Sequence, residues 1–158
     1  MAHQTGRDEQ SLALKLWVVL SRAHTAVEEH ARADIARHEL TLAEFAILEV
    51  LFHRGPLLLG EVQRRILVSS GGITYLVDRL EKRELVERRE CPEDRRARYA
   101  ALTPAGEALI REIFPRHAEA LERALAGLDA DEKEQAVDLL RRLGRYAAEA
   151  ARTASTGC

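Results

Sequence analysis

The spacing of the apolar residues changes twice along this chain, and this change restricts the fold more than any other feature. Up to Leu80 the apolar residues recur every three or four positions, which is typical of amphipathic helices. The segments 85–91 and 98–102 are short and bounded by turn residues, as expected of two strands joined by a loop over 92–97. After Thr103 the helical spacing returns. The sequence therefore predicts a mainly helical protein with one small β-hairpin.

Capping signals divide the helical parts into separate helices. Thr41 and Glu44 have the spacing of a capping box, which predicts a helix that ends near Gly55. Two short helices follow, one over 60–67 and one capped by a serine just after the turn. Thr103 before a proline predicts the start of the fifth helix, and an aspartate at position 129 caps the sixth. The expected order is four helices, the hairpin and two long helices.

Composition places the chain among globular proteins of one folded domain, 1–158. Hydrophobic residues make up 46% of the 158 residues and charged residues 32%, which excludes a disordered chain. No apolar run approaches the roughly 20 residues of a membrane span, and the start lacks a secretory signal, so we expect a cytoplasmic protein without membrane contact. The two cysteines, Cys91 and Cys158, do not have the short spacing of a zinc site. No metal, cofactor or catalytic constellation is expected, so an enzyme is not predicted.

One predicted helix has the composition of a helix that reads DNA. The segment 69–83 is apolar on one face and carries small or hydroxyl-bearing residues on the other. A major groove about 12 Å wide admits one α-helix, and small residues let its backbone approach while hydroxyls suit phosphates and base edges. The predicted contacts on this helix are Ser69, Ser70, Gly71, Gly72, Thr74, Tyr75 and Arg79.

The predicted hairpin adds positive charge beside that helix. Its loop carries Arg95 and Arg96, which suit the negative potential of a minor groove. The region 60–98 holds ten Lys and Arg against eight Asp and Glu, whereas the whole chain has a net charge of −2. Taken singly, these features also fit a solvated hairpin and an ordinary helix cap. Their combination with long flanking helices favours a protein that binds duplex DNA.

The same segments resemble the MarR family. The resemblance covers nearly the whole chain, and the Asp-x-Arg pattern of the predicted loop is its most characteristic part. It implies a winged helix-turn-helix lobe over about 41–103 and dimerisation helices over about 10–32 and 104–152. It further implies a homodimer that reads a palindromic operator and usually represses transcription. The motifs that carry the resemblance lie at 67–81, 85–89, 92–96 and 102–106.

Within this family the chain is most similar to repressors that govern resistance to 2-methylhydroquinone and catechols. Two other branches fit less well: the organic-peroxide sensors carry a reactive cysteine where Ala13 falls, and the urate-responsive group places an acid where Ala46 falls. The resemblance implies a small aromatic effector, phenolic or quinone-like, that releases the repressor from DNA. The segments that carry this closer likeness are 16–23, 41–46, 73–75, 91–96 and 113–117.

In this family, effectors commonly bind between the dimerisation helices and the winged lobe. That position implies candidates on the first, second and fifth helices: Trp17, Phe45, Glu49 and His117. Two rings and two polar groups suit a phenolic or quinone ring, since such pockets are mostly apolar with few polar groups. The alternative is that Trp17 and Phe45 belong to the core and that a backbone carbonyl satisfies His117.

Two other functions remain open at this point. Cys91 lies near several arginines whose charge would stabilise a thiolate, so a redox-sensing regulator is one alternative, and an ordinary strand cysteine is the simpler interpretation. A helical protein-interaction module that has lost DNA binding is the other, because net acidity weakens attraction to phosphates. The Arg95 and Arg96 pair and the hydroxyl-rich helix argue against that module.

Overall fold

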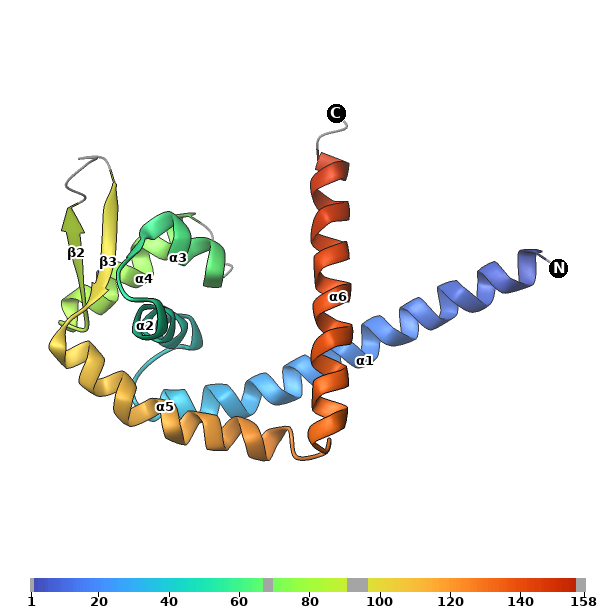
Figure 1. The fold of residues 1–158 in the computed structure, drawn as a ribbon, viewed down its shortest axis with the longest axis horizontal. Helices are drawn as coiled ribbons and strands as arrows, with labels where there is room; N and C mark the ends of the chain where they lie inside the picture. The colour runs from blue at the N-terminus through green and yellow to red at the C-terminus, as the bar shows by residue number, and fades with distance from the viewer. Residues whose placement is uncertain (1, 67–69, 91–96, 156–158) are drawn as a thin grey trace. The chain divides into compact units, whose positions relative to one another are not determined.

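The computed structural model describes residues 2–66, 70–90 and 97–155 (Figure 1). It divides into two compact units, residues 1–122 and 123–158. The first unit contains all of the sheet and the helices around it; the second contains the last helix. In chain order the elements are α1 (Ala2–Ala36), α2 (Leu42–Arg54), β1 (Leu57–Leu58), α3 (Leu59–Ile66), α4 (Ser70–Lys82), β2 (Val86–Glu90), β3 (Arg98–Leu102), α5 (Pro104–Ala124) and α6 (Ala130–Ser155).

The predicted mainly helical fold with a small hairpin is confirmed, with one addition. β2 and β3 pair antiparallel, with Val86 opposite Leu102 and Glu90 opposite Arg98. A third strand, β1, pairs antiparallel with the other edge of β3, with Leu57 opposite Ala100. The sequence did not predict β1 because a two-residue strand is too short to show alternation.

The core of the first unit is formed by the C-terminal end of α1, by α2, α3, α4 and α5, and by the sheet (Figure 1). Each of these helices contributes residues three or four positions apart, so that one face of each helix is apolar. Their side chains pack into one cluster with the inward residues of β2 and β3. Its fully buried members include Ile35, Ile47, Leu48, Val62, Val77, Leu80, Ala100, Ile110 and Ile113.

Three predicted helix starts are present with their capping bonds. The Thr41 hydroxyl accepts a hydrogen bond from Glu44 N (3.2 Å), and the Glu44 carboxylate accepts one from Thr41 N (2.8 Å), which completes the capping box of α2. Thr103 Oγ1 accepts from Gly106 N at the start of α5 (3.0 Å). Asp129 and Glu132 form a second reciprocal capping box at the start of α6 (2.9 Å for both bonds).

Gly106 lies where α5 passes closest to the end of α4. Thr103 N donates to Leu85 O (3.2 Å), which brings the first turn of α5 against this carbonyl. A Cβ atom at position 106 would lie 1.9 Å from Leu85 O. A glycine is therefore required at this position, because any other side chain forces the two backbone segments apart.

Two helices carry large apolar side chains that the described residues of their own unit leave uncovered. α1 exposes Trp17 (67%) and several neighbouring leucines and valines. Described by itself, α6 exposes Val137, Leu139, Leu140, Leu143 and Tyr146. Apolar side chains grouped in this way on a protein surface mark sites of association.

No helix in the described ranges is both long enough and apolar enough to cross a membrane.

Candidate nucleic-acid interface

α4 presents a polar face away from the core. Its buried side consists of Ile73, Val77 and Leu80, whereas Thr74 and Tyr75 are exposed. Asp78 and Arg79 lie one turn further along and continue this face, because residues four apart on a helix are neighbours. A helix that is apolar behind and polar in front is what entry into a major groove requires.

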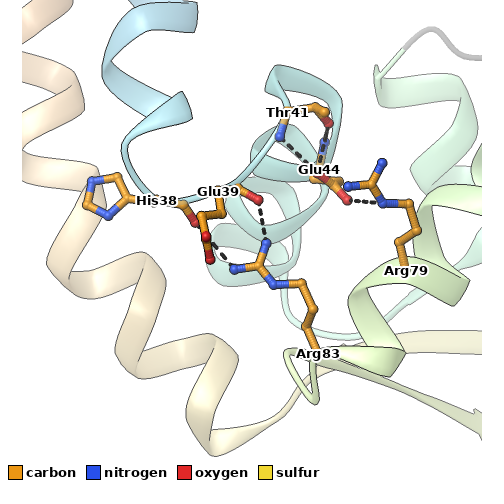
Figure 2. A network of polar contacts seen from close by, with 6 residues as sticks. All are labelled: His38, Glu39, Thr41, Glu44, Arg79 and Arg83. Atoms are coloured by element: carbon orange, nitrogen blue, oxygen red, sulfur yellow. Dashed lines mark hydrogen bonds and ion pairs between the residues drawn. The ribbon is translucent and has the colours of Figure 1, made fainter.

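Arg79 is tied to a buried carboxylate on α2. Its Nε lies 3.0 Å from Oε1 of Glu44, whose side chain has no exposed surface (Figure 2). Glu44 Oε2 accepts hydrogen bonds from the backbone N and the hydroxyl of Thr41 (2.8 and 3.0 Å). The capping glutamate of α2 therefore also anchors a side chain of α4.

Arg83 holds the C-terminal end of α4. Its guanidinium donates to the carbonyl oxygens of Glu39 (2.7 Å) and His38 (3.3 Å), in the turn that joins α1 to α2 (Figure 2). Glu39 itself has a positive φ of 57°, a backbone conformation found in tight turns. Arg79 thus attaches α4 to α2, and Arg83, just past the end of α4, attaches it to the turn before α2.

Arg88 joins the other side of α4 to β2. Its guanidinium forms ion pairs with Asp78 (2.7 Å) and with Glu81, and its backbone N donates to Glu81 Oε1 (2.9 Å). The same guanidinium reaches Thr74 O at 3.5 Å. One guanidinium cannot balance two carboxylates, but its charge offsets part of theirs and so weakens their repulsion of phosphates near this helix.

The described parts of the hairpin strands also hold two ion pairs of their own. Arg89 forms an ion pair with Glu87 (2.7 Å), and Arg98 with Glu90 (3.4 Å). The predicted loop arginines, Arg95 and Arg96, lie outside the described residues, as do Ser69 and the redox candidate Cys91. Ser70 and Gly71 form the first turn of α4, and Gly72 follows, half-buried.

The four candidate effector residues occupy different surroundings. Phe45 and His117 lie together in the core, with ring centroids 4.6 Å apart, and His117 Nδ1 is 3.3 Å from Asp34 Oδ2. Glu49, one turn beyond Phe45 on α2, is half-buried and lines a cavity. Trp17 is on the exposed face of α1. The structure thus brings Phe45 and His117 into contact and places Glu49 and Trp17 elsewhere.

The cavity beside Glu49 has a volume of about 660 Å³ and lies between α2 and α3. Its walls combine an apolar side, which includes Val50 and Ile66, with three basic side chains. Sequence reasoning did not single out these basic residues, because only the packing of α3 against α2 brings them together. They are His53, Arg54 and Arg65.

Sequence reasoning also missed the residues that fix α4 in place. Arg83 and Arg88 have no local signal, since their partners are up to 45 positions away. Glu44 was predicted only as part of the capping box of α2, although a carboxylate in a capping box has a second oxygen that can bind another side chain. In the described part of the chain, His, Cys, Asp and Glu side chains do not gather in groups of three or more that would hold a metal ion.

Comparisons with known proteins place the chain among transcription regulators. The model of the MarR family matches residues 40–97. The transcriptional regulator MhqR of Bacillus subtilis is 41% identical over 132 residues, which cover 84% of this chain and 91% of that protein.

Solved structures share the fold over most of the chain. BpsR of Bordetella bronchiseptica, whose DNA binding is regulated by 6-hydroxynicotinic acid, is 28% identical, with a TM-score of 0.74 over 80% of this chain and 90% of BpsR. Sco3205 of Streptomyces coelicolor, solved with DNA, has 24% identity and a TM-score of 0.77 over 83% of this chain and 84% of Sco3205. At that level of identity Sco3205 shows the fold alone. By its sequence and its fold, this chain belongs to the MarR family of winged helix-turn-helix transcription regulators.

Proposed function

We propose that this chain regulates transcription by placing α4 in the major groove of duplex DNA. The observation that carries the proposal is the anchoring of α4 by Arg79, Arg83 and Arg88, which leaves Thr74 and Tyr75 facing outward on a fixed helix. A reading helix needs this rigidity, since a misplaced donor cannot reach its base edge. The relationship to MhqR, a transcriptional regulator, supports the same role.

The DNA-binding form is a homodimer in this proposal. The exposed apolar side chains of α1 and of α6 need a partner, and a second copy of the chain supplies the same side chains in return. The segments 10–32 and 104–152 then act as dimerisation helices, and 41–103 as the DNA-binding lobe. Two-fold symmetry of the protein requires an operator that is an inverted repeat.

A gel-shift titration on the promoter of the chain's own gene tests this function. The expected result is a retarded complex that an excess of unlabelled promoter removes and an equal excess of scrambled duplex does not. A protein-interaction module without DNA binding gives no complex specific for the promoter, so that result would contradict the proposal.

The loop arginines have a separate expected effect on binding. Arg95→Ala or Arg96→Ala should weaken binding to specific and unrelated duplexes alike, because each side chain neutralises a phosphate or lies in a minor groove. The slope of log affinity against log salt should fall by about one unit for each arginine that neutralises a phosphate. Fluorescence anisotropy at several salt concentrations measures that slope, and an unchanged slope in both variants would place the loop away from DNA.

We further propose a repressor that a small phenolic or quinone-like molecule releases from DNA. BpsR, which responds to a hydroxylated aromatic acid, supports an aromatic effector. Phe45 of α2 packs against His117 of α5, and Glu49, one turn beyond Phe45 on α2, lines the separate cavity of mixed apolar and basic character. A ligand acts there only if it binds the two conformations of the DNA-binding lobe with different affinity.

Removal of a ligand-contacting side chain should uncouple the effector from DNA release. Glu49→Ala, at a half-buried position that lines the cavity, should bind promoter as wild type does but should no longer be released by catechol under reducing conditions. The DNA affinity of wild type should fall about 100-fold on saturation with ligand, the upper range of ordinary allosteric coupling. Cys91→Ser is the comparison variant. If only Cys91→Ser lost the release by catechol, the result would contradict the ligand site and support a thiol switch at Cys91.

A further inference from the structure

Glu44 has surroundings that a capping residue alone does not require. Its side chain has no exposed surface, and its two oxygens face different partners (Figure 2). Oε2 accepts both hydrogen bonds from Thr41, which completes the cap, whereas Oε1 faces Arg79 Nε at 3.0 Å. The capping box therefore uses only one of the two oxygens, and the second is directed at α4.

A buried carboxylate cannot give up its cationic partner without a large cost. Oε1 of Glu44 accepts no conventional hydrogen bond from the described residues, so the ion pair with Arg79 is what compensates its charge. Arg79 is consequently held at Nε while DNA binds. Its side chain as a whole is nevertheless 41% exposed, so the ion pair leaves Arg79 accessible at the surface of α4.

A second contact restricts the same guanidinium. Its central carbon lies 5.8 Å from the centroid of the Tyr75 ring, one turn earlier on α4. Cations at this distance from an aromatic ring are attracted to its face. Arg79 is therefore restrained from two directions, by a buried charge on α2 and by an exposed ring on α4.

We propose that Glu44 is a positioning residue for sequence recognition, which holds the Arg79 guanidinium in one orientation for the base edges. The inference rests on the proposed placement of α4 in the major groove. An arginine side chain that is free to move pairs with the nearest phosphate, and phosphates are present in every DNA sequence. A guanidinium held in one orientation can hydrogen-bond only to base acceptors at one position in the major groove. Glu44 thus contributes to specificity without touching DNA.

Removal of the Glu44 charge should act locally. Arg83 still fastens the end of α4 to the carbonyl oxygens of His38 and Glu39, and Arg88 still joins α4 to β2. Glutamine is also accepted at this position of a capping box, so Glu44→Gln keeps the start of α2. The variant therefore changes the restraint on Arg79 while the fold and the position of α4 remain.

The experiment compares two duplexes: the sequence that wild type enriches from a random pool, and an unrelated duplex of equal length. Glu44→Gln should bind the enriched duplex about tenfold more weakly, the size of effect expected when one specific base-edge interaction is removed. It should bind the unrelated duplex at least as well as wild type, because one negative charge has been removed. Glu132→Gln is the matched control, since Glu132 has the same place in the capping box of α6; it should change neither affinity.

A double-mutant cycle shows whether Glu44 acts through Arg79. Arg79→Gln removes the charged fork but keeps an N–H donor for the carboxylate, so this variant remains foldable. In the Arg79→Gln background, Glu44→Gln should have no further effect on the ratio of the two affinities. Thermal unfolding of each variant confirms that the protein is folded at the assay temperature.

Three results would overturn the inference. If Glu44→Gln weakened binding to the enriched and the unrelated duplex equally, Glu44 would have a structural role alone. If the ratio of the two affinities stayed as in wild type, Glu44 would have no part in specificity. A full effect of Glu44→Gln in the Arg79→Gln background would show that it acts without Arg79. Failure of wild type to enrich any sequence would contradict the proposed function itself, and this result is distinguishable from the other three.

Discussion

Arg79→Ala should lower the free energy of unfolding by about 3 kcal/mol, although the side chain it removes is partly exposed. The reason lies in Glu44, which the substitution leaves as a buried charge without its cation. Breaking a buried pair in this way typically costs about 3–5 kcal/mol, and the 41% exposure of Arg79 places the expected loss at the lower end. Urea denaturation followed by circular dichroism measures the change.

The double variant Arg79→Ala with Glu44→Gln should be more stable than Arg79→Ala alone. Neutralising the carboxylate removes the charge that had no remaining partner, so the second substitution should recover about 1–2 kcal/mol. If the loss of stability in the double variant equalled the sum of the losses in the two single variants, Glu44 and Arg79 would not be energetically coupled. Glu132→Gln, a change of the same type in the exposed capping box of α6, should not alter the stability of Arg79→Ala.

Gly106→Ala should destabilise the protein by about 2–3 kcal/mol, the upper range for overpacking a closely packed site. The added methyl group would lie 1.9 Å from Leu85 O, and this neighbour is backbone that cannot rotate away. The first turn of α5 must therefore move from the end of α4, which strains the bond from Thr103 N to Leu85 O. A shift of the urea midpoint without a change in slope is the expected observation.

Gly60→Ala is the matched control for that substitution. Position 60 is helical as well, but a Cβ atom there meets only Arg64 Nη1 at 3.7 Å, an ordinary contact with a flexible side chain. Alanine in a helix is more favourable than glycine by up to about 1 kcal/mol, so this variant should be at least as stable as wild type. If both variants had the same stability, the close approach at Leu85 O would not constrain the fold.

The features that could be predicted from the sequence depend on residues that are close together in the sequence. The capping box at Thr41 and the caps at Thr103 and Asp129 are local patterns, and each begins a helix where predicted. The hairpin was recognisable because its strands are bounded by turn residues. The polar face of α4 followed from helical spacing, which assigned Thr74 and Tyr75 to the exposed side.

The features that could not be predicted depend on residues distant in sequence. β1 is a strand only because β3 lies beside it, and Arg83 finds its acceptors in the turn before α2. The candidate effector residues illustrate the same limit. Phe45 and His117 do meet, but nothing in the sequence indicates that Asp34 joins them or that Trp17 is exposed within its own chain.

The negative net charge of the chain is compatible with DNA binding because of where its acids lie. Asp78 and Glu81 on α4 are both paired with Arg88, and Glu44 is buried beneath Arg79. Each of these carboxylates is thus paired with an arginine, which fixes the arginine in place and weakens the repulsion of phosphates. Net charge alone would have favoured the protein-interaction module, whereas the arrangement of the charges favours a DNA-binding surface.

Selection of bound duplexes from a random-sequence pool tests the central claim most directly. A dimer that places two copies of α4 in successive major grooves should enrich an inverted repeat whose half-site centres are about 10 base pairs apart. Thr74→Ala, which removes an outward hydroxyl of α4, should change the preferred base at matching positions in both half-sites. No enrichment over the input pool, or enriched sequences without two-fold symmetry, would contradict the account.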